Sequence, residues 1–352
     1  MSEIAAEVEQ LIGDVPPSSI RSYLQLNTPT LFARTSRAQY TLNGFEALEA
    51  QPAQTDIGTA GVVHRFEKAS LHLDDCIAWM NRQPAQSIHA VVTDPPYGLI
   101  EYSDHELGKL RRGQGGIWRI PPSFDGNQRA PLPRFTVLTA TDLDKLEAFF
   151  QGWARSLIRI LVPGANVVVA SNPLLSFIVA GALARAGLER RGELVRLTMT
   201  MRGGDRPKAA HVEFNGVSVM PRSMWEPWLL FRKPLEGRVQ DNLRKWGTGG
   251  FRRVSADKPF GDVIESSPTR AAERKIANHP SLKPQSFLRK LVRGVLPLTQ
   301  GVVLDPFAGS GSTLAAAESL GYESVGVERD LDYFNLAREA VPRLRALIVE
   351  GG

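Results

Sequence analysis

Cysteine and long apolar runs are nearly absent from this sequence of 352 residues. Its single cysteine, Cys76, excludes an internal disulfide and any zinc site built on several cysteines. No apolar run approaches the roughly 18 to 20 residues that a bilayer-spanning helix needs. The first residues, MSEIAAEVEQ, are acidic and lack the apolar core of a secretory signal. With 43% hydrophobic and 22% charged residues, the composition predicts a soluble cytoplasmic protein with one large α/β domain and an insertion, or with two domains.

Excess positive charge is also absent from most of the chain, because it is concentrated in one segment. Residues 201–275 contain 15 Lys and Arg against 9 Asp and Glu, whereas the rest of the chain contains 27 against 28. The same segment has three of the six tryptophans, Trp225, Trp228 and Trp246. Basic residues combined with aromatic rings favour contact with a polyanion such as nucleic acid. An ordinary solvated surface over core tryptophans would give the same composition, so charge alone leaves both interpretations open.

Strand-like and helix-like patterns alternate from about residue 66 onward. Strands are expected at 67–76, 87–93, 165–172, 193–202, 301–305 and 322–330, and helices at 77–83, 141–161, 173–187, 284–296 and 331–348. This alternation predicts an α/β fold with a mostly parallel, doubly wound sheet covered on both faces. Residues 1–62 are weakly patterned, and 99–140 is a long polar segment with many glycines and prolines.

The stretch GVVLDPFAGSGST, at 301–313, predicts a strand, a glycine turn and the start of a helix. The strand ends at Asp305, and Gly309 and Gly311 permit a tight turn and close approach of a ligand. The next strand ends at Glu328, 19 positions after Gly309. In a βαβ unit, an acidic residue at about this spacing binds the ribose hydroxyls of an adenosine-containing cofactor. The turn lacks the lysine of a phosphate-binding loop, so S-adenosyl-L-methionine, which has a ribose and no phosphate, fits better than a dinucleotide.

A second unusual turn, VVTDPPYG at 91–98, follows a short apolar strand. Its two prolines cannot continue a sheet ladder, and each fixes φ, so the backbone after Val92 is stiff. The turn carries one acceptor, Asp94, and one flat ring, Tyr97. A stiff turn with these two groups at the end of a strand indicates a site that holds a ligand.

Together, DPPY at 94–97 and DPFAGSG at 305–311 resemble the amino-methylating DNA methyltransferases, which act on adenine N6 or cytosine N4. The order, with DPPY first, is similar to the beta group of this family, and the likeness covers about 66–345. The resemblance implies a Rossmann-like sheet of seven mostly parallel strands in permuted order, with an inserted target-recognition segment. It implies four parts: an N-terminal extension of unknown role (1–62), a catalytic half with the long loop 99–140 (63–200), a target-recognition segment (201–278) and a cofactor-binding half (279–352).

The resemblance also implies roles for individual residues. Asp94 and the Pro95 carbonyl would accept hydrogens from the exocyclic amine of a flipped base, and Tyr97 would stack on that base. The expected catalytic residues are Asp94, Pro95, Pro96 and Tyr97. The expected cofactor-binding residues are Asp305, Pro306, Phe307, Gly309, Gly311, Ser312, Thr313 and Glu328, with His279, Pro280 and Lys283 of the HPSLKP element near the methionine end.

Two further sets are expected to contact the nucleic acid. Asp75 and Cys76, in LHLDDC, resemble residues that lie near the target base, although Asp75 could equally be a simple turn residue. The candidate phosphate or base contacts are Arg202, Arg206, Lys208, Arg244, Lys245, Arg252 and Arg253. Arginine is suited to bidentate readout of guanine, whereas a surface charge or a phosphate contact is the plainer role for each of them.

The resemblance predicts double-stranded DNA as the substrate of a cytoplasmic, nucleoid-associated protein. A homodimer, a cognate restriction endonuclease and a defence system are further possible partners, and neither a membrane partner nor a metal site is predicted. Aspartate at position 94 favours adenine, because cytosine-N4 members more often have serine there. Two other interpretations stay open. RNA and protein-glutamine methyltransferases use a similar turn, usually after their glycine motif, and a DNA-binding subunit without catalysis would keep the cofactor fold.

Overall fold

The computed structural model describes residues 61–96, 140–198, 207, 210–221, 223–279 and 281–349, together with the backbone of two short strands closer to the N-terminus. The chain divides into two compact units, Met1–Gly58 and Thr59–Gly352. In the first unit, β1 (Phe32–Ser36) pairs with β2 (Gln39–Leu42) in antiparallel orientation. The loop expected at 99–140 lies almost wholly outside the described residues, as does most of the extension at 1–62.

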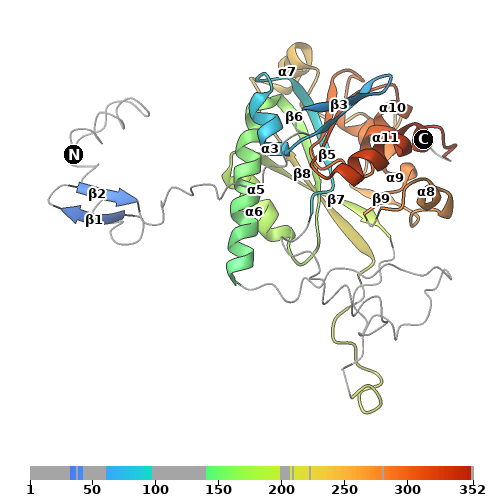
Figure 1. Cartoon of the computed structure of the whole chain (residues 1–352), viewed down its shortest axis with the longest axis horizontal. Helices are drawn as coiled ribbons and strands as arrows, with labels where there is room; N and C mark the ends of the chain where they lie inside the picture. Colours follow the sequence, from blue (N-terminus) through green and yellow to red (C-terminus); the bar gives the residue numbers. More distant parts are fainter. Residues whose placement is uncertain are drawn as a thin grey trace. The chain divides into compact units, whose positions relative to one another are not determined.

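The second unit is built on one sheet, in which nine described strands follow the order β3-β4-β11-β10-β5-β6-β8-β7-β9 (Figure 1). The strands are β3 (Val62–Arg65), β4 (Ala69–Leu73), β5 (Ile88–Thr93), β6 (Leu161–Ala170), β7 (Glu189–Leu197), β8 (Trp225–Arg232), β9 (Val263–Glu265), β10 (Val302–Asp305) and β11 (Glu323–Glu328). The expected number of seven is therefore corrected to nine. The seven strands from β4 to β7 form the expected sheet, and the short strands β3 and β9 extend its two edges by pairing with β4 and β7.

Five neighbouring strands, β4, β11, β10, β5 and β6, run parallel, so their carboxyl ends meet at one end of the sheet. We call this the carboxyl end of the sheet and the opposite one the amino end. β8 runs antiparallel between β6 and β7, so it leads the chain from Trp225 at the carboxyl end to Arg232 at the amino end. β8 lies within 201–278, and part of the segment expected to recognise DNA is thus a central strand.

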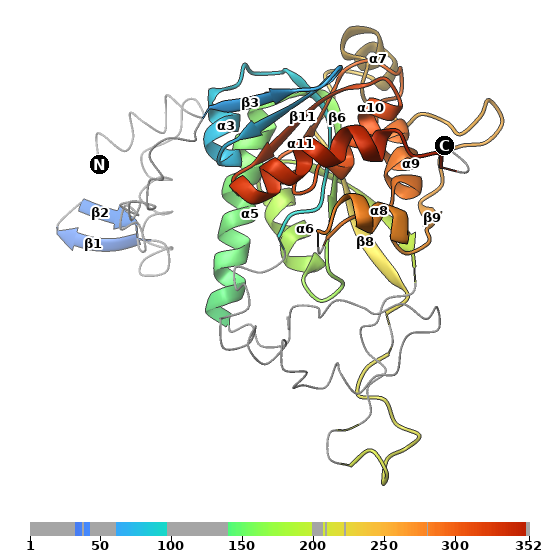
Figure 2. The same ribbon diagram turned by 45° about the vertical axis from the view of Figure 1, so that its right-hand side comes forward.

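Helices cover both faces of the sheet (Figures 1 and 2). They are α3 (Cys76–Arg82), α5 (Ala140–Ile160), α6 (Ser176–Arg185), α7 (Val239–Trp246), α8 (Ala271–Ile276), α9 (Gln285–Val295), α10 (Ser312–Ser319) and α11 (Leu331–Arg345). α3, α5 and α6 pack on one face, and α9, α10 and α11 pack on the other. This arrangement confirms the doubly wound α/β fold predicted from the alternation of strands and helices.

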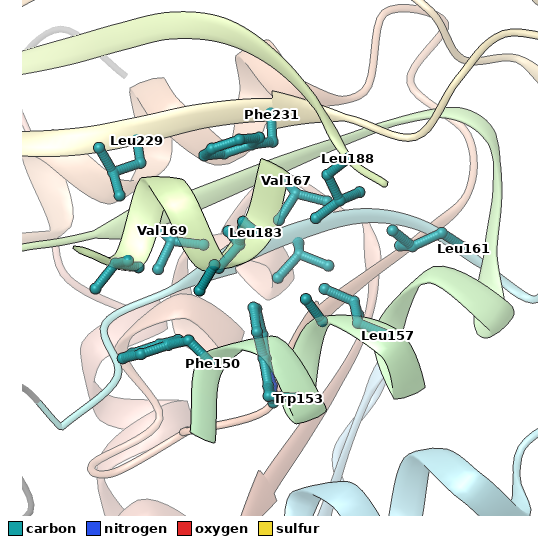
Figure 3. Close-up of a cluster of buried hydrophobic side chains, with 14 of the residues drawn as sticks. Phe150, Trp153, Leu157, Leu161, Val167, Val169, Leu183, Leu188, Leu229 and Phe231 are labelled. Atoms are coloured by element: carbon teal, nitrogen blue, oxygen red, sulfur yellow. The ribbon is translucent and has the colours of Figure 1, made fainter. Parts of the chain in front are cut away.

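The composition of the core follows from the alternation of side chains along the strands and from the spacing of apolar residues along the helices. Along β6, Val167 and Val169 face the helices α5 and α6, whereas Val168 and Ala170 face α9, because successive side chains of a strand point to opposite faces. Figure 3 shows the first of these layers, in which α5 contributes residues such as Trp153 at helical spacing. Each large apolar side chain buried here contributes roughly 1.5 to 3 kcal/mol. The strand ends are therefore held on a rigid platform.

Among the described residues, no helix is long and apolar enough to cross a membrane. Within the same ranges, no group of three or more His, Cys, Asp or Glu side chains is placed to hold a metal ion.

Candidate active site

Three acidic residues follow neighbouring strands at the carboxyl end of the sheet. Glu328 is the last residue of β11, Asp305 is the last residue of β10, and Asp94 comes directly after β5. These strands lie side by side in the order β11, β10, β5. The sheet thus brings the DPPY turn next to the glycine turn, although the two motifs are far apart in the sequence.

Asp305 is buried at the point where the two motifs meet. Its Oδ1 accepts a hydrogen bond from Thr93 Oγ1 at 2.7 Å and one from the Phe307 amide at 3.2 Å, so a side-chain bond joins the ends of β5 and β10. Burial raises the pKa of Asp305 to about 6, although hydrogen bonds from Thr93 and Thr313 oppose the shift. The charge of Asp94, which lines the same pocket as Asp305, also raises this pKa.

The glycine turn places backbone amides against the carboxylate of Glu328. Gly309 (φ +50°) and Gly311 (φ +76°) both have left-handed backbone conformations. The Gly309 amide donates to Glu328 Oε2 at 2.8 Å, and the Asp330 amide donates to Oε1 at 2.9 Å. Each carboxylate oxygen has a second lone pair, so Glu328 can also accept two hydroxyl groups. This geometry fits the two hydroxyls of a ribose.

The residues around the turn mainly hold it in place. Ser312 and Thr313 are buried and begin α10, and the Ser312 carbonyl accepts a bond from Gln285 Nε2 at 2.9 Å. Pro306 is buried, and the Phe307 ring packs against aromatic rings of α5. These predicted cofactor residues therefore gather at one turn, as the sequence motif implied.

His279, of the HPSLKP element, lies against the glycine turn. Its Nδ1 accepts a bond from the Ser281 amide at 3.2 Å, and its ring meets Tyr333 edge-on at 4.5 Å. A Cβ added to Gly309 would lie 3.0 Å from His279 Nε2, so the glycine allows the imidazole to approach. Burial, with a smaller effect of Lys283, lowers the pKa of His279 to about 4, and the ring is neutral at physiological pH.

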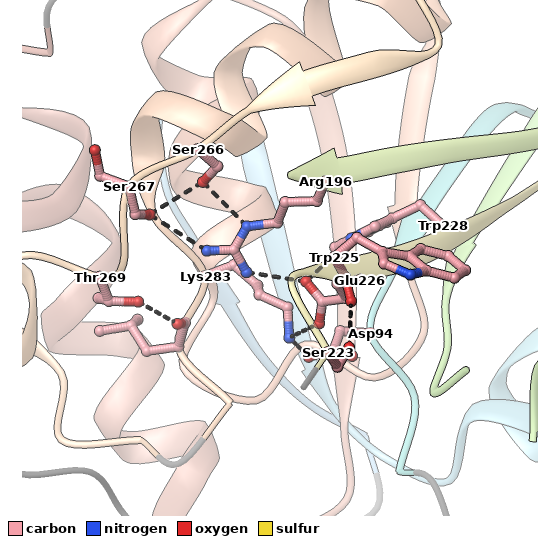
Figure 4. Close-up of polar contacts among 11 residues, drawn as sticks. Asp94, Arg196, Ser223, Trp225, Glu226, Trp228, Ser266, Ser267, Thr269 and Lys283 are labelled. Carbon is pink, nitrogen blue, oxygen red and sulfur yellow. Dashed lines mark hydrogen bonds and ion pairs between the residues drawn. The ribbon is translucent and has the colours of Figure 1, made fainter. Parts of the chain in front are cut away.

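Lys283, from the same element, contacts the DPPY turn directly. Its ammonium forms one ion pair with Asp94 and a second, at 3.3 Å, with Glu226 of β8. Figure 4 shows the ammonium between the two carboxylates. Glu226 Oε2 in turn accepts bonds from Arg196 Nη1 at 2.9 Å and from Trp228 Nε1 at 3.3 Å. Sequence analysis missed Glu226, Arg196 and Trp228 as site residues, and the local signal was a lone carboxylate within WEPWLLF.

Asp75 and Cys76 lie on the far side of Glu328 from the DPPY turn. They follow β4, which pairs with β11, and β10 separates β11 from β5. Asp75 Oδ1 accepts a bond from the Ala78 amide at 2.9 Å and caps α3. Cys76 is buried, and burial raises the pKa of its thiol to about 12. A contact of either residue with a target base stays a prediction, whereas the capping role of Asp75 is present in the structure.

Several predicted residues lie outside the described part of the chain: Tyr97, Arg202, Arg206, Lys208 and Pro280. The segment with Arg202, Arg206 and Lys208 connects Leu197, the end of β7, to Trp225, the start of β8, and these two residues are paired partners at the carboxyl end of the sheet. The two ends of this segment therefore lie at the same end of the sheet as the DPPY turn.

The other predicted DNA contacts, Arg244, Lys245, Arg252 and Arg253, lie at the amino end of the sheet. In α7, Asn242 bonds to the Pro163 carbonyl near the start of β6, and Arg252 bonds to Tyr322 directly before β11. Figure 1 shows α7 at this end of the molecule. The structure does not bring these four residues together with Asp94, because β8 carries the chain to the opposite end of the sheet before they occur.

A pocket opens between the DPPY turn and the glycine turn. It is lined by Asp94, Trp228, His279, Ser281, Lys283, Leu288, Asp305, Phe307, Ala308, Gly309, Ser310, Ser312 and Thr313. Carboxylates at its wall suit a cationic sulfonium, and the glycine turn has no lysine for a pyrophosphate. The residues present therefore fit S-adenosyl-L-methionine.

Comparison with known proteins agrees with this geometry. Residues 88–339 match the model of the N6/N4 methyltransferase family, described as DNA methylase. The chain belongs to the DNA methylase family. The enzymes of this family methylate an amino group of a base in double-stranded DNA, and S-adenosyl-L-methionine is their methyl donor.

Individual DNA methylases resemble the chain over most of its length. The Type II methyltransferase M.HindIII of Haemophilus influenzae is 24% identical over 76% of this chain and 93% of its own. The Type II methyltransferase M2.DpnII of Streptococcus pneumoniae is 30% identical over 75% of this chain and 86% of its own. Among solved structures, the cytosine-N4-specific PvuII DNA methyltransferase shares the fold, with a TM-score of 0.50 and 15% identity over 81% of this chain and 88% of that one.

Proposed function

We propose that the chain methylates the N6 amino group of adenine at a specific site in double-stranded DNA, with S-adenosyl-L-methionine as the methyl donor. The observation that carries this proposal is the position of Asp94. The carboxylate follows β5 and lines the same pocket as the glycine turn after β10. An amine bound at Asp94 would therefore face the methyl group of a cofactor bound at that turn.

The proposed chemistry is a direct displacement without a covalent enzyme intermediate. The exocyclic amine is a poor nucleophile, because its lone pair is delocalised into the ring. Asp94 and the Pro95 carbonyl would accept its two hydrogens and so direct the lone pair toward the methyl group. The prolines hold both acceptors in place, and such preorganised groups are worth on the order of 10²- to 10³-fold in rate when one is removed. Tyr97 would stack on the flipped base, which compensates part of the few kcal/mol that unstacking costs.

The proposed cofactor contacts follow the strand ends. Glu328 would accept the ribose hydroxyls, because both of its oxygens are already oriented by backbone amides. His279 lies against Gly309, and Lys283 would be near the methionine end, as the family resemblance implies.

Adenine is preferred over cytosine in this proposal because of the aspartate at position 94. The order of the two motifs supports membership of the beta group. We also propose that the enzyme acts in a Type II restriction-modification system with a cognate endonuclease, as the names of its relatives suggest, and that it forms a homodimer.

Sequence recognition is proposed for residues 201–224 rather than for the whole of 201–278. This part lies between Leu197 and Trp225 at the carboxyl end of the sheet and contains Arg202, Arg206 and Lys208. The four basic residues at the amino end are less suited, because the sheet separates them from the pocket.

The direct test is expression in a host that lacks DNA methylation, followed by mass spectrometry of the nucleosides of its DNA. The wild type should produce N6-methyladenine, and Asp94→Ala should produce none or very little. Asp241→Ala is a matched control, because it removes an exposed carboxylate on α7 at the other end of the sheet; it should methylate like the wild type.

Other outcomes would change the proposal in defined ways. N4-methylcytosine would keep the mechanism and overturn the base. Equal methylation by the wild type and Asp94→Ala would overturn the role of the carboxylate. Absence of any methylated base, with purified protein also inactive on unmethylated DNA, would overturn the DNA substrate and favour an RNA or protein acceptor or a silent binding subunit.

A further inference from the structure

Four charged side chains form a continuous chain of ion pairs beside the DPPY turn. Asp94 and Glu226 supply two negative charges, and Lys283 and Arg196 supply two positive charges (Figure 4). The side chains of Lys283 and Arg196 are only 10% and 9% exposed. Because buried charges are costly unless they are paired, the two positive charges offset part of the cost of burying the two negative ones.

Glu226 has several contacts in addition to its ion pair with Lys283. Arg196 is its cross-strand neighbour in the β7–β8 pair, and Trp228, two residues along β8, donates to the same oxygen. Arg196 is itself fixed by Ser266 Oγ at 3.0 Å and lies 5.1 Å from the centre of the Phe287 ring. The other oxygen, Oε1, faces Lys283. Glu226 is thus a fixed carboxylate with one oxygen committed to the scaffold and one to the lysine.

Both groups of the ion pair between Glu226 and Lys283 remain charged. Burial favours the neutral form of Glu226, but Lys283 and Arg196 outweigh it and hold the pKa of Glu226 below its ordinary value. Burial likewise favours neutral Lys283, but Asp94 and Glu226 outweigh it and raise the pKa of Lys283. The ammonium is therefore a strong donor to both carboxylates at neutral pH.

Lys283 and the target amine compete for the same carboxylate. An ammonium has three donors and no acceptor, and its full positive charge adds a Coulomb attraction to the carboxylate that a neutral amine lacks. A lysine held by Asp94 alone would keep that carboxylate from the amine. Glu226 offers the ammonium a second carboxylate at 3.3 Å. The ammonium can therefore donate mainly to Glu226 while Lys283 stays in the site.

We propose that Glu226 is a positioning residue that retains Lys283 by an ion pair, so that the Asp94 carboxylate is available to the amine of the target base. This inference rests on the proposed methylation of a base amine at Asp94. Through Glu226, strand β8 would influence how strongly the Asp94 carboxylate accepts a hydrogen bond from the amine.

The test compares initial rates of methylation for the wild type, Glu226→Gln and Glu226→Asp. The substrate is plasmid DNA from a methylation-free host, at saturating DNA and saturating labelled S-adenosyl-L-methionine. Glu226→Gln should lower kcat at pH 7 by about 10- to 100-fold, the factor that corresponds to a charged hydrogen bond. The cofactor dissociation constant should change by less than about threefold. Glu226→Asp, which keeps the charge, should recover a substantial part of the rate.

The strand pair β7–β8 provides a matched control. At its other end, Glu189 forms the equivalent cross-strand pair with Arg232, whose side chain is also 10% exposed. Both Glu226→Gln and Glu189→Gln leave a buried arginine without its carboxylate partner, so both should lower the melting temperature. Only Glu226→Gln should lower kcat.

The pH profile separates positioning from a merely structural role. The titratable and charged groups that face Lys283 are Asp94 after β5, Glu226 on β8, Arg196 on β7 and the neutral imidazole of His279 in the preceding loop. Without the Glu226 charge, the pKa of Lys283 should fall, and loss of its proton would release Asp94. The rate of Glu226→Gln relative to the wild type should therefore increase between pH 7 and 9.5.

Three results would overturn the inference: a kcat of Glu226→Gln within twofold of the wild type, an equal loss of kcat in Glu189→Gln, or a rate ratio that does not change with pH. The wild-type reaction reports on the proposed function separately. If the wild type methylates no DNA, the proposed function fails together with this inference; if it does and the ratios behave otherwise than stated, only the role of Glu226 fails.

Discussion

Replacing Asp305 by asparagine should stabilise the protein above pH 6, because the buried carboxylate is held there at an energetic cost. Burial raises its pKa from 3.8 to about 6, so the folded state binds the proton more tightly than the unfolded state. Below about pH 4 both states are protonated and the group carries no penalty. Between about pH 4 and 6 only the unfolded state loses the proton, and the free energy of unfolding falls as the pH rises. Above pH 6 the penalty reaches about 3 kcal/mol, at roughly 1.4 kcal/mol for each pKa unit.

Asparagine preserves the local hydrogen bonds. The bonds from Thr93 and from the Phe307 amide both go to Oδ1, which the amide oxygen can replace. The Thr313 hydroxyl also bonds to Asp305, and it can accept a bond from the amide nitrogen instead of donating one. The substitution therefore removes the charge with little change in shape, and the charge accounts for the difference in stability.

The assay is urea unfolding of both proteins at a series of pH values. The free energy of unfolding of Asp305→Asn minus that of the wild type should increase by about 2 kcal/mol between pH 4.5 and pH 8. Asp241→Asn, which changes an exposed carboxylate on α7, should show a difference that stays nearly constant with pH. A difference for Asp305→Asn that is flat with pH, or a variant less stable than the wild type at pH 8, would refute the reasoning.

Three further predictions concern the same end of the sheet. Gly311→Ala should lower the free energy of unfolding by about 2 to 5 kcal/mol, because its Cβ would lie 2.4 Å from Val341 Cγ2 at a φ of +76°; Gly152→Ala in α5, where a Cβ meets nothing within 4 Å, should not destabilise, and equal urea midpoints for the two variants would contradict this. Glu328→Gln should raise the dissociation constant for S-adenosyl-L-methionine by about tenfold or more in calorimetry, whereas Glu339→Gln on the exposed face of α11 should leave it unchanged. The Cys76 thiol should react with a thiol reagent such as Ellman's reagent only after unfolding, because it is buried with a pKa of about 12; fast labelling of the folded protein would argue against this burial.

The parts of the site that could be predicted from sequence are those in which chemistry is local. The turn after β10 needs glycines at positive φ, and Glu328 follows at a spacing set by one helix and one strand. The DPPY turn likewise contains its acceptor and its rigid residues in four consecutive positions. Such motifs define their own geometry, and the fold only has to place two of them side by side.

The parts that were missed depend on contacts between distant residues. Glu226 gains its role from Arg196, which is 30 positions away, and from Lys283, which is farther still. β8 itself was not expected as a strand, since it contains Pro227 and lies in a basic segment. The structure accommodates this proline because the β6–β8 pairing ends at Trp228, so no ladder bond from the Pro227 nitrogen is required on that side.

The separation of the predicted DNA contacts between the two ends of the sheet has a topological cause. Sequence position shows that Arg244 and Lys245 lie in a basic segment, but not at which end of the sheet they emerge. Each crossing of the sheet moves the chain from one end to the other, and the unrecognised strand β8 added one crossing. A single missed strand therefore hid the fact that the predicted contacts lie at both ends of the sheet, and their contact with DNA stays a prediction.

The pairing of Leu197 with Trp225 has a consequence for how such an enzyme can diversify. The Thr198 amide donates to the Met224 carbonyl at 3.0 Å, so the chain that leaves β7 returns to β8 at nearly the same point. Doubling the length of a segment closed in this way costs only about 0.6 kcal/mol of entropy. A change in the length of the intervening sequence therefore costs little entropy as long as Thr198 and Met224 stay paired. Insertions and deletions between these two anchors need not alter the DPPY turn, the glycine turn or the core between them.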